Sequence, residues 1–243
     1  MKISGNTVLI TGGATGIGLA LAETSVTHGN EVVVCGRRRD KLALAKGRVP
    51  QIHVRVCDVS KPSARRALGD WSVARFPRLN VLVNNAGVQW AVDFRKGAQD
   101  LPHVDEELAT NLAAPIHLSA LLIPHLERRK AAALVNISSG LGSTLAAVPV
   151  YSATKAALHS LSLSMRHQLR DTTVRVFEVA PPIVETELAR GRRRPTEADH
   201  TMTAGAVAAG IVDALARDRY EEPLGAAANL HDKRDALFSA INE

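Results

Sequence analysis

Short runs of β-branched residues alternate with longer segments of helical spacing, and this alternation limits the possible folds more than any other feature. Six runs read as strands: TVLIT (7–11), EVVVC (31–35), IHVRV (52–56), VLVNN (81–85), ALVNIS (133–138) and VRVFEV (174–179). Between them, apolar residues recur every three or four positions, as on one face of a helix. Strands joined by crossover helices form a parallel sheet. We therefore expect an α/β fold, a doubly wound parallel sheet with helices on both faces.

The chain has 243 residues, which suits one large α/β unit. No Pro/Gly/Ser-rich linker and no tandem repeat divides it, so we expect a single domain over 1–243. The stretch at about 186–203 is polar, rich in arginine and without clear periodicity, which predicts a mobile substrate loop. The tail after it indicates only a helix and a short last strand.

Composition excludes several classes of protein. Hydrophobic residues make up 46% and charged residues 22%, as in a globular rather than a disordered chain. The net charge of +6 comes largely from arginine runs at 37–39 and 190–194, and no nucleic-acid motif accompanies them. The second run faces either substrate or solvent, and the sequence leaves that open. We expect no nucleic-acid partner.

Two cysteines, Cys35 and Cys57, make no disulfide framework, and we expect both to be reduced and buried. The apolar stretch near the N-terminus is too short for a signal peptide, and no later segment is apolar enough to span a membrane. These features predict a cytoplasmic protein without a membrane partner.

A glycine-rich segment, TGGATGIG at 11–18, closes the first strand and opens the first helix. Glycines let the backbone turn tightly and approach a pyrophosphate, while the helix start offers free N–H groups and the positive end of its dipole. A plain turn is the alternative, but the position between a strand and an amphipathic helix favours a dinucleotide site.

The second strand ends in CGRRR, with Gly36 where NAD-binding folds usually have an acidic residue. Arg37 follows directly, and Arg38 comes next. Planar guanidinium groups bind phosphate, and a carboxylate would repel it. We therefore expect NADP(H) as cofactor, with Arg37 as the primary contact to the 2′-phosphate and Arg38 as the second.

Tyr151 and Lys155, in PVYSATKAALHSL, are four residues apart and share one face of a helix. The tyrosine could merely fill space while the lysine reaches water. Alternatively, the ammonium favours the phenolate, which makes Tyr151 a usable general acid or base. The motifs upstream favour the catalytic interpretation.

These motifs occur in one order: TGGATGIG, NNAG at 84–87, Asn111, a serine pair at 138–139 and YSATK. In this order the chain resembles the short-chain dehydrogenase/reductase family over about residues 4–190. The combination of SSG, the YSATKAALHS helix and PPIVET is similar to its DltE-like oxidoreductase branch. The resemblance implies a Rossmann-like fold.

The resemblance implies four catalytic residues: Asn111, Ser139, Tyr151 and Lys155. Asn111 would support a water in a proton relay with Lys155; a helix-interior asparagine satisfied by backbone is the alternative. The serine is ambiguous, because Ser139 is the second of its pair but stands twelve residues before Tyr151, whereas Ser138 has the family spacing of thirteen. We favour Ser139, since a one-residue deletion in the following loop explains the difference.

The resemblance also implies the cofactor contacts. Asp58 and Val59 resemble the adenine-contacting pair, although an aspartate there is also a common turn residue. Two positions depart from the family pattern: Thr15 replaces the basic residue of many NADP-dependent relatives, and Pro182 replaces a glycine. The expected contacts are Gly12, Ala14, Thr15, Gly16, Ile17, Gly18, Arg37, Arg38, Asp58, Val59, Asn85, Ala86, Gly87, Tyr151, Lys155, Pro181, Val184 and Thr186.

The prediction is an NADP(H)-dependent oxidoreductase that transfers hydride between the nicotinamide and a small or moderately hydrophobic carbonyl/alcohol substrate, without a metal. Apolar residues near the motifs, such as Trp90 and Val148, favour such a substrate. Relatives imply a homodimer or homotetramer. Two alternatives remain: a non-catalytic NADP(H)-sensing protein, and an isomerase or dehydratase of the same fold.

Overall fold

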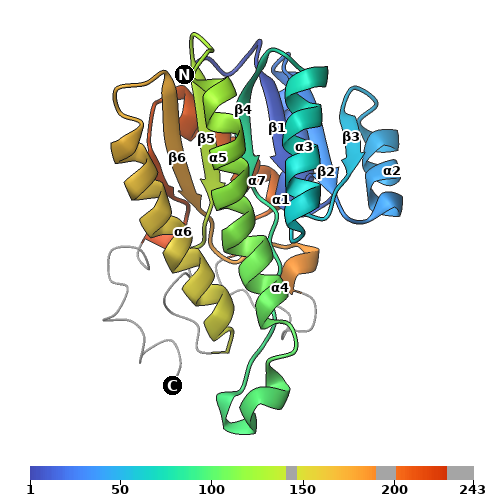
Figure 1. Ribbon diagram of the computed structural model, residues 1–243, viewed down its shortest axis with the longest axis vertical. Coiled ribbons are helices and arrows are strands. Elements are labelled where there is room, and N and C mark those ends of the chain that lie inside the picture. The colour runs from blue at the N-terminus through green and yellow to red at the C-terminus, as the bar shows by residue number, and fades with distance from the viewer. Residues whose placement is uncertain (141–146, 190–200, 229–243) are drawn as a thin grey trace.

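The chain folds around one parallel sheet of seven strands in the order β3-β2-β1-β4-β5-β6-β7 (Figure 1). The computed structural model describes residues 1–140, 147–189 and 201–228. The strand order reverses between β1 and β4, which is the switch point of a doubly wound fold. The predicted fold class is confirmed.

Every strand expected from the sequence is present, with its bounds shifted by at most two residues at either end. The strands are β1 (Thr7–Thr11), β2 (Glu31–Gly36), β3 (His53–Val56), β4 (Leu79–Asn84), β5 (Ala132–Ile137), β6 (Val174–Ala180) and β7 (Glu221–Pro223). The helices are α1 (Gly16–Thr27), α2 (Arg39–Arg48), α3 (Pro62–Arg75), α4 (Val104–Leu108), α5 (Ala114–Leu126), α6 (Pro149–Gln168) and α7 (Ala204–Ala216). The 3₁₀ turns η1 (Phe94–Asp100) and η3 (Glu187–Ala189) and the π-helical turn η2 (Ala109–Ala113) complete the set.

Helices cover both faces of the sheet, and each face has its own apolar core. Side chains of α1, α2 and α7 pack on one face, together with alternate residues of the central strands. Those of α3, α5 and α6 pack on the other, and these three helices lie side by side across the near face in Figure 1. Burial on both faces explains the nearly continuous apolar runs of the central strands.

Buried amides tie α5 and α6 to the sheet. Asn84 Nδ2 donates to Asn136 Oδ1 at 2.9 Å and to Ser119 Oγ at 3.3 Å, and Asn136 Nδ2 donates to Ser162 Oγ at 2.9 Å. Because buried polar groups must be paired, this chain of bonds fixes the two helices relative to β4 and β5. Because Ser162 and Tyr151 both belong to α6, these bonds also fix the position of Tyr151 relative to the sheet.

Other expectations have mixed outcomes. Cys35 and Cys57 are free and buried thiols, as predicted. The loop predicted at 186–203 includes 190–200, which lie outside the described residues, as does the second arginine run. Before these residues the chain forms η3, and after them Met202 pairs with Val184 in an isolated β-bridge. Within the described ranges, no helix is both long and apolar enough to cross a bilayer.

Candidate active site

A cavity of about 420 Å³ opens at the carboxyl ends of β1 to β6. Its walls are the segments that follow these strands and the first turns of α6, which is where ligands bind in open α/β sheets. Every predicted site residue lines the cavity except Gly18 and Asn111, which lie just behind its wall. The fold therefore brings the sequence motifs to one place.

The glycine-rich turn leaves no room for side chains. A Cβ on Gly18 would lie 2.5 Å from Gly12 O, and one on Gly12, whose φ is +66°, would lie 2.9 Å from Ala86 Cα. The next helix, α1, starts after an extended Thr15 that makes no capping hydrogen bond with its side chain. The first N–H groups of α1 thus face the cavity as a potential anion site.

Hydrogen bonds join the glycine-rich turn to the NNAG segment after β4. Thr11 Oγ1 accepts from the backbone N–H groups of Asn85 and Ala86, both at 3.0 Å, and donates to Val83 O. Asn85 Nδ2 donates back to Thr11 O at 2.9 Å and to Gly12 O at 3.3 Å. The two motifs are therefore one rigid unit.

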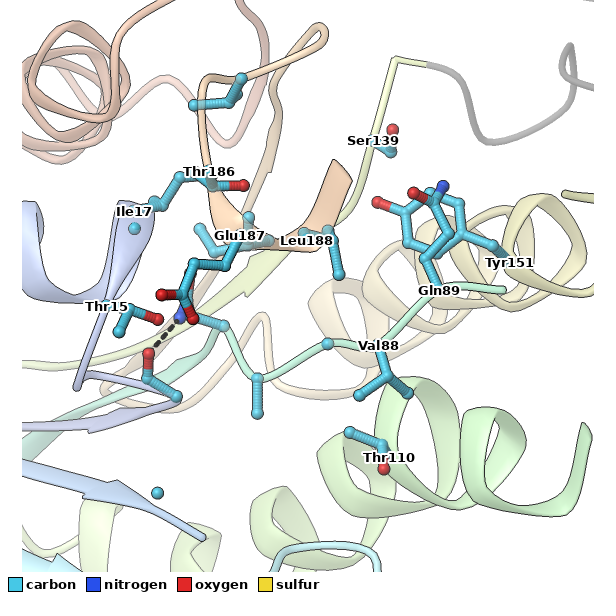
Figure 2. A pocket seen from close by; sticks show the side chains of 18 of the residues that line it. Thr15, Ile17, Val88, Gln89, Thr110, Ser139, Tyr151, Thr186, Glu187 and Leu188 are labelled. Carbon is cyan, nitrogen blue, oxygen red and sulfur yellow. Dashed lines mark hydrogen bonds between the residues drawn. The ribbon is translucent and has the colours of Figure 1, made fainter. Parts of the chain in front are cut away.

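The end of the cavity near β2 is rich in cations, and they are already paired. Arg37 bonds Glu106 in the middle of α4. Arg38 Nη1 donates to Glu187 Oε2 at 2.7 Å, and Lys41 Nζ donates to the other oxygen of Glu187 at 3.2 Å. In Figure 2, Glu187 points to the same end of the cavity as Thr15, whose hydroxyl accepts from Arg38 at 3.4 Å.

Asp58 also lies at this end, and its side chain stabilises a turn. Its Oδ1 accepts from Ser60 N at 3.0 Å and from Ser60 Oγ at 2.8 Å. Val59 is buried beside it and, like Asp58, lines the cavity. Both expected positions thus face the cavity, although Asp58 has the turn role that the sequence left as an alternative.

Tyr151 and Lys155 lie at the opposite end of the cavity, in the first turns of α6. Pro149 opens this helix, where a missing N–H costs nothing. Both side chains are buried, with 6% and 5% of their surface exposed, and both line the cavity. Lys155 Nζ is 5.7 Å from the centre of the Tyr151 ring and donates to Ile137 O at 2.7 Å.

The charge of Lys155 depends on two buried acids. Burial lowers the pKa of its ammonium to about 8, whereas the carboxylates of Glu178 and Glu107 raise it. Glu178 comes from β6 and Glu107 from α4, so the acids approach from different elements. The ammonium of Lys155 is therefore a stronger acid than that of a solvent-exposed lysine.

Asn111 is fully buried in the π-helical turn η2, and its side chain hydrogen-bonds the backbone that follows NNAG. Its Oδ1 accepts from Val88 N and its Nδ2 donates to Val88 O, both at 2.9 Å. Nδ2 also donates to Thr154 Oγ1 on α6 at 3.2 Å. The side chain therefore joins the cavity wall to the helix of Tyr151. Single π turns of this kind are frequent at functional sites.

The two serines after β5 differ in surroundings. Ser138 is buried, and its N–H and hydroxyl both donate to Val179 O, at 2.9 and 3.4 Å. Ser139 is half-buried, and Figure 2 shows it at the end of the cavity where Tyr151 and Gln89 lie. The loop that follows, 141–146, lies outside the described residues. Both serines line the cavity, and Ser139 is the more exposed of the two.

The PPIVET segment after β6 forms the remaining wall. Pro181 O accepts from Gly140 N at 2.9 Å. Ile183 O and Glu185 N bond with the backbone of Met202, so the N–H and C=O of Val184 point the other way. Val184 and Thr186 both line the cavity. A backbone donor and acceptor are thus available here despite Pro182.

Comparison with known proteins agrees with this geometry. A profile described as short chain dehydrogenase matches residues 6–197. The chain belongs to the short chain dehydrogenase family. It is 54% identical over 194 residues to the uncharacterized oxidoreductase DltE of Bacillus subtilis, covering 79% of this chain and 77% of that protein. The family predicted from the motifs is confirmed.

Solved structures of the family share the fold. A short chain dehydrogenase from Burkholderia cenocepacia in complex with NADP superposes with a TM-score of 0.85 at 23% identity, over 99% of both chains. A short chain dehydrogenase/reductase from Burkholderia phymatum in complex with NAD gives a TM-score of 0.84 at 24% identity, over 100% of this chain and 97% of that one. Structural relatives of this chain thus include complexes with both dinucleotides.

The sequence motifs did not indicate four charged residues near the site: Lys41, Glu106, Glu107 and Glu187. Lys41 and Glu187 form the cation–carboxylate cluster with Arg38, although they are 146 residues apart. Glu107 is buried next to the Lys155 region, and burial raises its pKa to about 7, while the N–H of Trp90 and the charge of Lys155 lower it. Its position one turn before Asn111 was a signal that could have been used.

A further cluster of polar side chains includes His159, which is one turn after Lys155 on α6. Atoms of His159, Glu178 and Glu221 lie within 4.8 Å of one another, close enough to hold a metal ion. His159 Nδ1 is 2.7 Å from Glu178 Oε2, and Arg166 lies 3.8 Å from Glu221. The neighbouring arginine and the direct contact favour an ion-pair network.

Proposed function

We propose that this protein is an NADP(H)-dependent oxidoreductase that transfers hydride reversibly between the nicotinamide and a carbonyl/alcohol substrate. The main support is the buried pair Tyr151 and Lys155 at one end of a cavity whose other end is the glycine-rich turn. The pair provides a proton-exchanging group in the same cavity as the phosphate cradle. A protein that only binds the cofactor does not need the Tyr151 hydroxyl and the Lys155 ammonium together for proton exchange.

The described residues fit a dinucleotide. The absence of a Cβ at Gly12 and Gly18 lets the turn pack closely against NNAG and the start of α1, and the uncapped N–H groups of α1 suit the charge of a pyrophosphate. Ala86 and Gly87 give a flat wall between the two ends. Val184 N–H and C=O, with the Thr186 hydroxyl, suit a carboxamide.

In this proposal the bound nicotinamide supplies or accepts the hydride, and the protein moves the proton. Tyr151 donates its proton to the substrate oxygen during reduction and accepts it during oxidation. Ser139 donates a hydrogen bond to the same oxygen as charge develops on it. Lys155 favours the phenolate of Tyr151 and binds the ribose hydroxyls of the nicotinamide half.

Asn111 has a supporting role in the proposed reaction. By holding Val88 through both backbone groups and Thr154 through its hydroxyl, it fixes the wall opposite Tyr151. We propose that the same turn supports the water of the relay that reprotonates Lys155. In this proposal the side chain of Asn111 has a structural role, and its backbone binds the relay water.

The preference for NADP(H) rests on the cations at the β2 end. Arg37 and Arg38 follow Gly36, where no carboxylate is present to bind a ribose 2′-hydroxyl. Lys41, which shares the carboxylate of Glu187 with Arg38, adds a third positive charge beside Arg37 and Arg38. The counter-ions Glu106 and Glu187 must give way to a 2′-phosphate, so we propose that they weaken this preference without reversing it.

The substrate side of the cavity supports a moderately hydrophobic compound. Trp90 lines it and stacks on His103 with ring centres 4.6 Å apart, and Pro182 lies on the opposite wall. Gln89 is the polar exception there. Apolar walls with one amide suit an aldehyde or ketone better than a highly charged substrate.

A panel of aldehydes, ketones and alcohols, followed by NADPH absorbance and repeated with NADH, tests this proposal. We expect turnover of at least one carbonyl compound with a higher kcat/KM for NADPH. Turnover only with NADH would refute the assignment of Arg37 and Arg38. NADPH oxidation that does not track substrate loss would indicate an isomerase or dehydratase.

We also propose that the single catalytic domain assembles into a homodimer or homotetramer. Large apolar side chains are exposed on neighbouring helices: Leu108 on α4, Ile116 and Leu121 on α5, and Leu163 on α6, each about two-fifths exposed. Apolar surface on these three helices suits an obligate interface. Sedimentation equilibrium of the protein tests this, and a monomer at micromolar concentration would refute it.

A further inference from the structure

Thr154 is a buried polar residue that the proposed mechanism does not use. It lies on α6 between Tyr151 and Lys155, with 1% of its surface exposed. Its hydroxyl donates to Tyr151 O at 2.7 Å and accepts from Asn111 Nδ2 at 3.2 Å. One oxygen atom therefore joins the first turns of α6 to the π-helical turn η2.

The bond from Thr154 to its own helix would be unremarkable by itself. A threonine in a helix often bonds a carbonyl of the preceding turn. Ser164 is the ordinary case on α6: it is exposed, and its hydroxyl donates to Ser160 O at 3.0 Å. Thr154 differs because it is buried and because its oxygen also accepts from a side chain of another element. The position of this hydroxyl is thus set from outside α6 as well as from within it.

The directions of these bonds follow from Asn111. Its Oδ1 accepts from Val88 N and its Nδ2 donates to Val88 O, both at 2.9 Å, which fixes the orientation of the amide. The second N–H of Nδ2 then donates to Thr154, so the single hydroxyl proton goes to Tyr151 O. Removing the hydroxyl would leave a buried N–H of Asn111 without its acceptor, which is costly.

The carbonyl of Tyr151 links the two members of the proposed catalytic pair. In an α-helix it accepts from the N–H four residues later, which here is that of Lys155. The Thr154 hydroxyl bonds the same oxygen, and hydroxyl bonds to carbonyls of the preceding turn often bend a helix. The bond therefore acts on the backbone that sets how the side chains of Tyr151 and Lys155 lie.

The other end of this chain of bonds is the cavity wall. Val88, which Asn111 holds, lines the same cavity as Tyr151, and both are labelled in Figure 2. The bonds thus run from the wall through Asn111 and Thr154 to the backbone of Tyr151. A change at Thr154 would alter the position of Tyr151 relative to the wall that faces the substrate.

We propose that Thr154 is a positioning residue that sets the Tyr151 hydroxyl against the cavity wall at Val88. The proposal rests on the function proposed above, because it needs Tyr151 to exchange the proton. Thr154 is not among the described residues that line the cavity, so it acts through Asn111 and Tyr151 rather than on a ligand. A shift of about 1 Å in a reacting group can lower a rate about a hundredfold. Thr154 should therefore affect kcat more than cofactor binding.

Thr154→Val tests this proposal, because valine keeps the branched shape and lacks the hydroxyl. With a carbonyl substrate identified by the panel, we expect kcat to fall by about ten- to a hundredfold. The Kd for NADPH should not change, because the glycine-rich turn is held by Thr11 and Asn85. Thr154→Ser keeps the hydroxyl and should retain most of the wild-type kcat. An equal loss of kcat in the serine and valine variants would refute the role of the hydroxyl.

Thr172 offers a matched control after the end of α6. Its hydroxyl donates to Leu169 O at 2.8 Å, also three residues back, and accepts from Val174 N at 3.1 Å. Thr172→Val thus removes the same two kinds of hydrogen bond at a site distant in sequence from Tyr151. We expect both valine variants to lower Tm by about 2–4 °C, and only Thr154→Val to lower kcat.

The outcomes separate this proposal from the proposed function. If Tyr151→Phe abolishes turnover while Thr154→Val keeps the wild-type kcat, the role of Thr154 is refuted and the function stands. If Thr154→Val and Thr172→Val lower kcat equally, the loss reflects stability, and positioning is refuted. If Tyr151→Phe retains turnover, the proposed function is refuted and this proposal with it. If Thr154→Val does not fold, Thr154→Ala and Thr154→Ser decide, because they differ only in the hydroxyl and equal kcat would refute the proposal.

Discussion

The two ends of the cavity are built differently. At the end near β2, the charged side chains are a quarter to a half exposed and pair with one another across distant elements. At the end near α6, Tyr151 and Lys155 are buried, and the Asn111 amide and the Lys155 ammonium donate to backbone carbonyls. Exposed ion pairs contribute about 0–1 kcal/mol each and exchange partners easily. Buried hydrogen-bonded groups hold one geometry.

This difference assigns different tasks to the two ends. A region of exchangeable ion pairs can select among cofactors without fixing the position of any reacting atom. A region of buried hydrogen bonds can hold reacting groups in place, as proton transfer requires. Substitutions at the α6 end should therefore change the rate of reaction, and substitutions at the β2 end should change which cofactor binds.

The largest effect is expected for Tyr151→Phe. It removes only the hydroxyl that exchanges the proton, so we expect kcat to fall by about 10²- to 10⁴-fold while NADPH still binds. Stopped-flow or steady-state NADPH oxidation measures the rate, and quenching of tryptophan fluorescence measures binding. A Tyr151→Phe protein with equal loss of binding and rate would indicate a structural tyrosine instead.

Gly18→Ala tests the tight packing of the glycine-rich turn. The added Cβ would lie 2.5 Å from Gly12 O, and that backbone is held by Asn85. We expect a loss of about 1–3 kcal/mol in the free energy of unfolding, as for overpacked sites, measured by urea denaturation. Gly47→Ala, in an open part of α2, is the matched control and should not destabilise. Equal stability of the two variants would contradict the tight packing described above.

Glu187→Gln should sharpen the cofactor preference. It frees Arg38 and Lys41 from their carboxylate, so the affinity for NADPH should rise by about fivefold, the equivalent of roughly 1 kcal/mol. The affinity for NADH should stay constant because NADH has no 2′-phosphate. Lys41→Met should have the opposite effect on NADPH alone. Weaker NADPH binding by Glu187→Gln would show that the carboxylate assists the cofactor.

Glu106→Gln is expected to have the smallest effect. It frees Arg37, whose side chain is about half exposed, so the affinity for NADPH should rise by about twofold. Isothermal titration with NADPH and NADH measures the change. If this variant exceeds Glu187→Gln in its effect, Arg37 rather than Arg38 and Lys41 is the main phosphate contact.

Much of the fold and site could be predicted because the deciding signals are local. The strands read as β-branched runs, and the glycine-rich turn, NNAG and YSATK each fall within a few residues. The seventh strand, Glu221–Pro223, is short and polar, so only its approximate place could be expected. Local motifs placed at the ends of parallel strands converge without further information.

The missed residues depend on contacts between distant elements. Glu187 meets Arg38 only because the segment after β6 crosses the cavity to the start of α2. Glu107 looks like a solvent-facing residue in the acidic run VDEE, and its burial results from the packing of α4 against α6. The surroundings of Ser138 and Ser139 likewise depend on the pairing of β5 with β6. Of these contacts, only that of Glu107 has a trace in the residue spacing, because Glu107 stands one turn before Asn111.

The Thr11 hydroxyl has a consequence for how this site can be altered. One oxygen atom holds the N–H groups of Asn85 and Ala86 and donates to Val83 O, so the glycine-rich turn takes its position from a neighbouring strand. Grafting NNAG alone into another scaffold would leave two amides without an acceptor, and grafting the glycine-rich turn alone would leave the Thr11 oxygen without its two donors. The two strands β1 and β4 must therefore be transferred together with both of the loops that follow them. A chimera between two family members should take both segments from the same parent.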